Sequence, residues 1–240
     1  MSAARVMVLC LGLLAAPQTF ADGDPLEPIN RPIHALNEGV DRIVLKPAAK
    51  TYRRVLPGFV RAGIGNFFSN LGEVSNVVNN VLQAKPGDAF NDFGRLFINS
   101  NVGVGGVFDV ASSLGLPEHQ EDFGQTLATR RVGQGPYIVL PSLGPSTLRD
   151  AIARPIDTAL NPVRHVDYVP TRNVLLAADL VVTRADILQA ESVIFGEKYL
   201  FYRDAYLQRR NFLINDGEVT DTFDYLFARL KLTCLCFYGE

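Results

Sequence analysis

Residues 90–117 read FNDFGRLFINSNVGVGGVFDVASSLGLP, and most of what the sequence says about the fold starts from this segment. Between Leu96 and Leu116 the only charged side chain is Asp109, and glycines interrupt the middle of the segment. A membrane-spanning helix needs about 20 apolar residues without such interruptions, so this segment is not one. It predicts two short apolar helices folded back at a flexible glycine turn, in a hairpin that is either buried in a core or dips partway into a bilayer.

The clearest helix of the chain lies just upstream, at residues 59–83. Apolar side chains recur there at helical spacing and form one continuous stripe. A solvated helix face normally carries Lys and Glu, but the opposite face here carries amides with little charge. Neutral amides on this face indicate that it lines a narrow wet passage. The alternative is a helix packed on both sides, with its amides bonded to neighbouring backbone. The residues expected to line the passage are Asn66, Asn70, Asn76 and Asn80.

Length and composition restrict the class of protein. The chain has 240 residues, 48% of them hydrophobic, which is enough for one large domain or two small ones. Its net charge is −2 and it has no run of basic residues, so we expect no nucleic-acid partner. Because no other apolar stretch is long enough to span a bilayer, the composition excludes a polytopic membrane protein.

The first 21 residues have the features of a secretory signal. Arg5 precedes an apolar run, and the small residues Thr19 and Ala21 suit cleavage before Asp22. Cys10 stands in the middle of the apolar run, where it is poorly placed for lipidation. We therefore expect a secreted chain whose mature N-terminus is Asp22 and carries no acyl group.

The rest of the chain alternates helical patterns with proline-rich and glycine-rich segments. Prolines at 25, 28 and 32 predict an extended strap rather than a helix. Helical spacing then predicts helices at 34–44, 48–55 and 89–100. Residues 123–145 contain so many Gly and Pro residues that we expect loop or extended chain, with one strand-like piece at 137–140.

Beyond that loop, the C-terminal third is expected to be helical. Ser146 or Thr147 caps a helix that Pro155 stops, and a second short piece follows at 156–160. Helical spacing resumes over 173–207 with a break at Gly196. Residues 215–217 form a turn, and 223–230 a last amphipathic piece.

No catalytic or metal-binding pattern emerges from the residues. The sequence has no nucleophile elbow, phosphate loop or dinucleotide fingerprint, and its three histidines are far apart. The polar run 118–122 fits no metal-ligand spacing, so it predicts a solvated edge. Cys234 and Cys236 are only half a zinc site and are interpreted as incidental. We expect no enzyme, no metal and no cofactor.

Several motifs, in order along residues 24–215, resemble the MlaA (VacJ) family of Gram-negative outer-membrane proteins. They are DPLEPINR at 24–31, GVGGVFDVA at 103–111, FGQTL at 123–127, GQGPYIVLPSLG at 133–144 with TLRD at 147–150, and RDAYLQRRNF at 203–212. The resemblance implies an all-α fold: a flat ring-like bundle of amphipathic helices, with the glycine hairpin, irregular Gly/Pro-rich loops and a polar central channel. The chain then divides into a signal peptide (1–21), a helical lipid-transport domain (22–215) and a C-terminal tail (216–240).

The resemblance also implies a function. Family members remove mislocalised phospholipids from the outer leaflet of the outer membrane and pass them to a soluble periplasmic carrier, which maintains lipid asymmetry. They sit toward the periplasmic face and associate with trimeric porins. The hairpin beside the channel, which is implied to control lipid uptake, corresponds to Gly103, Gly105, Gly106, Val107, Phe108 and Asp109.

This sequence departs from the family at its N-terminus. Most members carry an acylated cysteine just after the signal, and no cysteine lies between Ala15 and Asp24. We therefore expect the apolar helices and a porin partner to hold the protein in the membrane. A periplasmic lipid-modifying enzyme and a porin-associated structural protein remain the alternatives.

Overall fold

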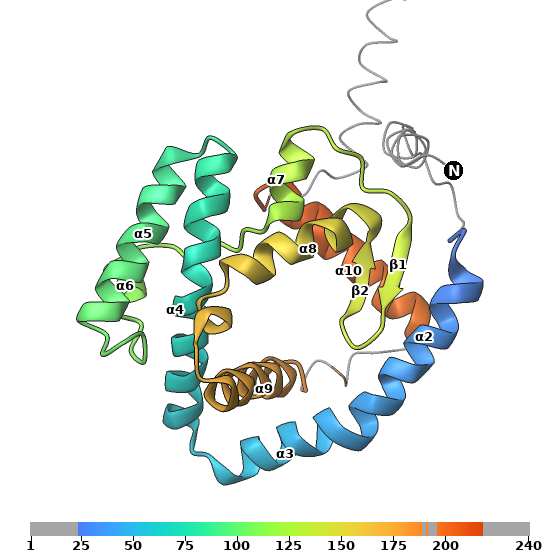
Figure 1. Cartoon of the computed structure of the whole chain (residues 1–240), viewed down its shortest axis with the longest axis horizontal. Coiled ribbons are helices and arrows are strands. Elements are labelled where there is room, and N and C mark those ends of the chain that lie inside the picture. Colours follow the sequence, from blue (N-terminus) through green and yellow to red (C-terminus); the bar gives the residue numbers. More distant parts are fainter. Residues whose placement is uncertain (1–23, 189–190, 192–195, 218–240) are drawn as a thin grey trace, which may run out of the picture.

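The computed structural model describes residues 24–188, 191 and 196–217. Within that part the chain is mostly helical, and its helices follow one another around a flat ring (Figure 1). The expected all-α, ring-like fold is confirmed. The predicted signal, the helical piece at 223–230 and the cysteines at 234 and 236 lie outside the described residues.

One long arc forms the first side of the ring (Figure 1). It consists of α2 (Glu27–Val40), a π-helical turn η1 (Asp41–Leu45) and α3 (Lys46–Val55). The predicted extended strap is wrong, because α2 accommodates two of the three prolines. Pro28 lies in the first turn, where a backbone N–H has no helical partner to lose. Pro32 lies inside the helix, where contacts made by its neighbour Asn30 hold the backbone in place.

The next side of the ring is α4 (Gly58–Leu82), which matches the predicted helix to within one residue at each end. Helix α5 (Pro86–Asn101) and the short α6 (Val110–Ser113) lie on the outer side of α4 (Figure 1). The predicted hairpin is therefore present, but its second arm is a single turn of helix after a long bonded loop.

The Gly/Pro-rich segment folds more regularly than expected. It begins with α7 (Phe123–Thr129), where a loop was predicted, because the Asp122 carboxylate caps the helix by accepting a 2.9 Å hydrogen bond from the Gln125 N–H. The expected strand is β1 (Tyr137–Leu140), and it pairs antiparallel with β2 (Gly144–Thr147), with Tyr137 opposite Thr147.

The remaining helices complete the ring. Thr147 caps α8 (Leu148–Leu160), as predicted, but α8 continues through Pro155 instead of stopping there. A short turn η2 (Pro162–His165) leads into α9 (Val169–Asp186), which packs against α3 and α4. Gly196, at a φ of 79°, precedes α10 (Lys198–Ile214), so the predicted break is confirmed, as is the turn at 215–217.

Two asparagines of α2 close the ring against the β-hairpin. The Asn30 amide donates to the Tyr137 carbonyl at 3.0 Å and accepts from the Val139 N–H at 2.8 Å. Asn37, two helical turns later, makes the same pair of bonds with Leu140 and Ser142. Each amide thus makes the backbone hydrogen bonds that a further strand would make at this edge of the β-hairpin. These bonds fix α2 to a hairpin that is more than 100 residues away in sequence.

Polarity is distributed differently from that of an ordinary globular protein. Large apolar side chains point outward: Phe59, Phe90 and Ile43 are 79%, 78% and 76% exposed. The buried positions described here include many amides and charges, and the buried apolar ones are often alanines. No helix in the described ranges is both long enough and apolar enough to cross a membrane.

Candidate functional site

A buried layer of polar side chains, here called the polar seam, separates α4 from α5. The Glu73 carboxylate accepts a 2.7 Å bond from Arg95 Nε, and both residues are at most 2% exposed. Two turns after Glu73, Asn80 donates to Asp92 at 2.7 Å, and one turn before it, Asn70 donates to the Ser100 hydroxyl at 3.0 Å. Asn70, Glu73 and Asn80 lie three and seven residues apart, so they share the face of α4 that is turned toward α5.

Arg95 joins the seam to the hairpin. Its Nη1 donates to the Ser112 hydroxyl at 3.0 Å and to the Leu116 carbonyl at 2.7 Å, while Nη2 lies 3.4 Å from Asp109. Burial acts to lower the pKa of Arg95, but its hydrogen bond to Glu73 and the nearby carboxylates outweigh that effect and raise it. The guanidinium therefore stays charged although it is buried.

The hairpin loop is held by its own backbone. The N–H groups of Gly105, Gly106 and Phe108 donate to the carbonyls of Ser100, Asn99 and Gly103 at 2.8–3.0 Å. A Cβ on Gly103 would lie 2.2 Å from the Phe108 oxygen, and one on Gly106 would lie 2.7 Å from Asn70. The glycines thus allow close packing, besides the positive φ of Gly105 and Gly106.

The acidic end of the loop is fixed as well. Asp109 accepts hydrogen bonds from the Asn99 amide at 3.0 Å and from the Ser112 N–H at 3.1 Å, so it caps α6. Burial acts to raise the pKa of Asp109, but these hydrogen bonds and Arg95 hold it below its usual range. Val107 and Phe108, in contrast, are exposed at the tip. The hairpin therefore presents apolar side chains outward and a carboxylate inward.

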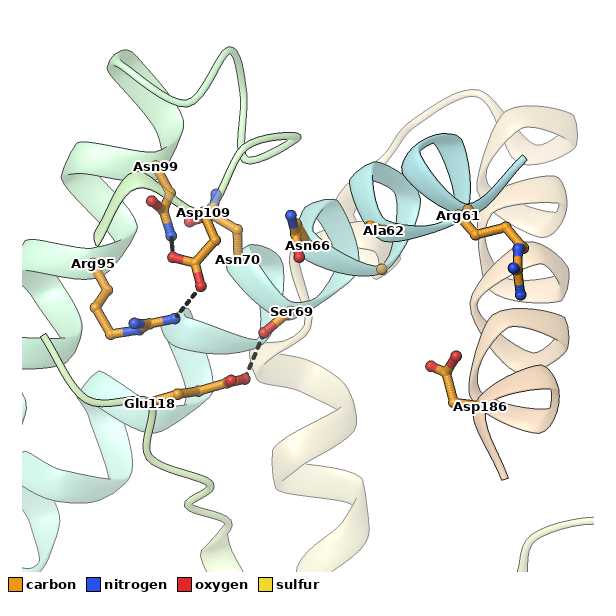
Figure 2. Close-up of a pocket in the computed structure, with 12 residues that line it drawn as sticks. Arg61, Ala62, Asn66, Ser69, Asn70, Arg95, Asn99, Asp109, Glu118 and Asp186 are labelled. Atoms are coloured by element: carbon orange, nitrogen blue, oxygen red, sulfur yellow. Dashed lines mark hydrogen bonds and ion pairs between the residues drawn. The ribbon is translucent and has the colours of Figure 1, made fainter. Parts of the chain in front are cut away.

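A first cavity of about 460 Å³ lies between the hairpin, α4 and the end of α9 (Figure 2). Its lining is mainly polar, and Figure 2 shows Asn99, Asp109 and Arg95 at one end and Arg61 with Asp186 at the other. The residues lining it are Gly58, Arg61, Ala62, Gly65, Asn66, Ser69, Asn70, Arg95, Asn99, Asp109, Glu118 and Asp186.

A second cavity of about 340 Å³ continues along α4 toward α7 and α10. It includes Asn76, His119 and Arg209 in its lining, and it shares Ser69 and Glu118 with the first cavity. The Ser69 hydroxyl donates to the Glu118 carboxylate at 2.7 Å, so this hydrogen bond stands where the two cavities meet.

The four predicted asparagines lie on one side of α4, but in different surroundings. Asn66 and Asn70 line the first cavity, and Asn66 also donates to the Val107 carbonyl of the hairpin at 3.1 Å. Asn76 lines the second cavity, where it donates to the His119 carbonyl at 2.8 Å. Asn80 is fully buried on Asp92 and lines neither cavity.

The motif analysis missed one buried charge cluster, which joins α7, α8 and α10. Arg210 donates to Asp122 at 2.5 and 2.7 Å and to Asp150 at 2.9 Å, and the Tyr206 hydroxyl donates to Asp150 at 2.9 Å. Gly124 makes room, since a Cβ there would lie 2.4 Å from Arg210. The available signal was charged residues in or next to three separate motifs: Asp150 and Arg210 lie inside two of them, and Asp122 directly precedes a third. This cluster supports the wall of the second cavity through Asp122.

Within the described ranges, no group of three or more His, Cys, Asp or Glu residues is arranged to hold a metal ion. His119 instead lies 2.6 Å from Asp92 of the polar seam. The polar run 118–122, expected to be a solvated edge, therefore lies partly against the seam and the second cavity.

The fold and its cavities define a class of protein: a flat ring of helices with an apolar outer surface and polar cavities along its inner helices. The chain belongs to the MlaA lipoprotein family, whose model matches residues 22–213.

Relatives in several bacteria carry names that describe lipid transport. The "Intermembrane phospholipid transport system lipoprotein MlaA" of Shigella flexneri is 36% identical over 203 residues, covering 82% of this chain and 80% of the relative. The protein of the same name in Haemophilus influenzae is 32% identical over 216 residues, covering 87% and 86%. A solved structure described as "Structural basis for maintenance of bacterial outer membrane lipid asymmetry" matches with a TM-score of 0.70 at 34% identity, covering 80% of this chain and 99% of that chain.

Proposed function

We propose that this protein removes mislocalised phospholipids from the outer leaflet of the outer membrane and passes them inward, which maintains lipid asymmetry. The observation that carries the proposal is the inverted polarity of the α4–α5 pair. Charges and amides are paired between the helices, whereas Phe90, Phe93 and Phe97 point outward. This arrangement suits a protein surrounded by lipid, where polar groups must find partners inside.

A phospholipid headgroup needs a wet route, because burying an unpaired charge in hydrocarbon is very costly. We propose that the two cavities form that route along α4, with Asn66, Asn70 and Asn76 in its lining and Asn80 supporting it from the seam. The hydrogen bond between Ser69 and Glu118 would have to open for passage from one cavity to the other. The hairpin from Gly103 to Asp109 stands beside the first cavity and is proposed to control lipid uptake.

The proposed setting follows the family. Residues 1–21 export the chain, residues 22–215 form the transport domain on the periplasmic face of the outer membrane, and residues 216–240 form a tail. A trimeric porin is the proposed membrane partner, and a soluble periplasmic carrier receives the lipid. The relatives are named as transport lipoproteins, which favours a role without catalysis.

Filling the first cavity tests the route. Gly65 lines this cavity, and a Cβ there meets nothing within 4 Å, so Gly65→Phe should occupy the route without disturbing the fold. In cells lacking their own homologue, we expect this variant to lose the resistance to detergent with EDTA that the wild-type chain restores. Gly87→Phe is the matched control, because Gly87 is equally open but lines neither cavity. If a folded Gly65→Phe variant restores full resistance, the proposed route is wrong.

A further inference from the structure

The charged residues that line the first cavity differ in whether they have partners. Arg95 and Asp109 belong to the seam and the hairpin, and Glu118 accepts the hydrogen bond from Ser69. For Arg61 and Asp186, the described part of the chain provides no side-chain hydrogen bond and no ion pair. Among the described residues, one cation and one anion of this cavity are therefore not paired with another side chain.

Arg61 and Asp186 lie where α3, α4 and α9 come together. Arg61 lies in the first turns of α4 and Asp186 is the last residue of α9, and Figure 2 shows both at the end of the cavity away from Arg95. Arg53 of α3 donates to the Ala185 carbonyl at 3.4 Å, which fixes the end of α9 beside α3.

The pKa of Tyr52 on α3 is affected by both of these charges. The Tyr52 hydroxyl is buried without a hydrogen-bond partner in the described chain, as is Arg61 Nε. Burial raises the pKa of Tyr52, Asp186 adds to the rise and Arg61 opposes it, so both charges act on the same hydroxyl. Arg61 and Asp186 also line the same cavity and lie at the same end of it.

We propose that Arg61 and Asp186 recognise the phosphoethanolamine headgroup of a phospholipid, a proposal that rests on the proposed transport function. A guanidinium binds phosphate oxygens through paired N–H donors, so Arg61 takes the phosphate. A primary ammonium has N–H donors for a carboxylate, so Asp186 takes the amine. A phosphoglycerol headgroup offers Asp186 only neutral hydroxyl donors in place of a charged ammonium, and a choline offers it no N–H donor.

The size of the cavity fits a headgroup. Pockets that bind small molecules occupy roughly 300–1,000 Å³, and this one occupies about 460 Å³. Its walls carry amides at Asn66 and Asn70, which neither repel nor compete with either charge of a zwitterion. The acyl chains would remain at the apolar outer surface around the exposed Phe59.

The test uses the full chain, purified in detergent and incubated with vesicles of equal parts phosphatidylethanolamine and phosphatidylglycerol. After the protein is recovered, the bound lipids are quantified by mass spectrometry. We expect the wild type to enrich phosphatidylethanolamine. Asp186→Asn should lower the ratio of phosphatidylethanolamine to phosphatidylglycerol about threefold, the effect of an ion pair open to water, by reducing only the first lipid. Arg61→Gln should reduce both lipids, and Arg61→Lys should restore part of the loss.

Matched controls remove the same charges elsewhere. Asp167→Asn and Arg164→Gln change exposed residues outside both cavities and should leave the ratio and the amounts unchanged. An unchanged ratio in a folded Asp186→Asn variant would overturn the headgroup site while leaving transport intact. Recovery of neither lipid with the wild type would instead count against the proposed function itself.

Discussion

At the scale of single residues, the surroundings of Asp157 on α8 strongly alter its acidity. Its carboxylate accepts a 2.8 Å hydrogen bond from the Phe123 N–H, next to the cluster of Asp122 and Arg210. Burial raises the pKa of Asp157 to about 6, and the charge of Asp122 adds to the rise, while the Phe123 bond and Arg210 oppose it. Because the pKa in the folded state lies above its ordinary value of 3.8, folding favours the protonated form. The favourable contribution is complete below about pH 4 and is lost as the pH rises through 6.

Asp157→Asn should therefore stabilise the protein at pH 8 by about 1–2 kcal/mol, after allowance for partial exposure. The asparagine keeps an oxygen that can accept the Phe123 bond, and it removes the charge that is unfavourable above pH 6. The difference from the wild type should shrink toward zero at pH 4. Thermal unfolding at pH 4, 6 and 8 measures this. A stability gain that does not depend on pH would mean that the charge of Asp157 is not its cause.

At the scale of elements, hydrophobic periodicity predicted the position of a helix reliably, whereas proline did not predict where a helix ends. The stripe over residues 59–83 predicted α4 almost to its ends, because eight or more apolar positions at one spacing leave little choice. The rule that proline ends a helix failed at Pro32 and Pro155. Close to each proline a side chain of the same helix bonds to a distant segment: Asn30 to β1 and Asp157 to the Phe123 N–H. Residues 123–129 were expected to be a loop from composition, but the cap supplied by Asp122 decided in favour of a helix.

The candidate site was predictable only in part. Asparagines at helical spacing identified one face of α4, since that information is local to the helix. What faces them was not local: Arg95, Glu118 and Asp186 reach the first cavity from three other segments. A sequence without its fold cannot indicate that these charges meet, nor which of them are already paired.

The hairpin provides a prediction at this scale. Gly103→Ala should destabilise the protein by about 3 kcal/mol, because the new methyl group would overlap the Phe108 carbonyl, which cannot move without breaking the loop. Gly106→Ala should cost about 1–2 kcal/mol, from a φ of 89° and a clash with the Asn70 side chain. Thermal unfolding and hydrogen exchange of the amides at 105, 106 and 108 report the loss.

Gly87→Ala is the control for the hairpin variants. Gly87 is helical and open, so alanine there should be neutral or stabilise by about 0.5 kcal/mol. If Gly103→Ala left the exchange of the loop amides as slow as in the wild type, the loop would be more adaptable than its bonds indicate.

At the scale of the whole molecule, the ring is an open chain of helices that must be closed by contacts between its ends. An apolar core cannot do this alone, because the buried apolar cluster around Tyr137, Val139 and Tyr199 is small. Hydrogen bonds and ion pairs between distant segments therefore close the ring. Asn30 binds β1, the Tyr199 hydroxyl donates to Asp24, and Arg184 of α9 pairs with Asp41 at 2.6 Å. Because hydrogen bonds have a preferred geometry, they hold the ring in one shape, which suits a ring whose outer surface is apolar.

Removing the Asn30 amide should open the ring at this point. Asn30→Ala leaves the Tyr137 carbonyl and the Val139 N–H buried without partners, at a cost of about 2 kcal/mol. For a chain of this length that corresponds to a melting temperature lower by roughly 4–8 °C. Asn30→Asp should be at least as harmful, because a carboxylate accepts from Val139 but cannot donate to Tyr137, and it would face Asp24. Asn37→Ala should cost less, since water reaches that half-buried amide and can replace it. Equal losses at Asn30 and Asn37, measured by thermal unfolding in the same detergent, would mean that burial of the amide does not set the strength of the closure.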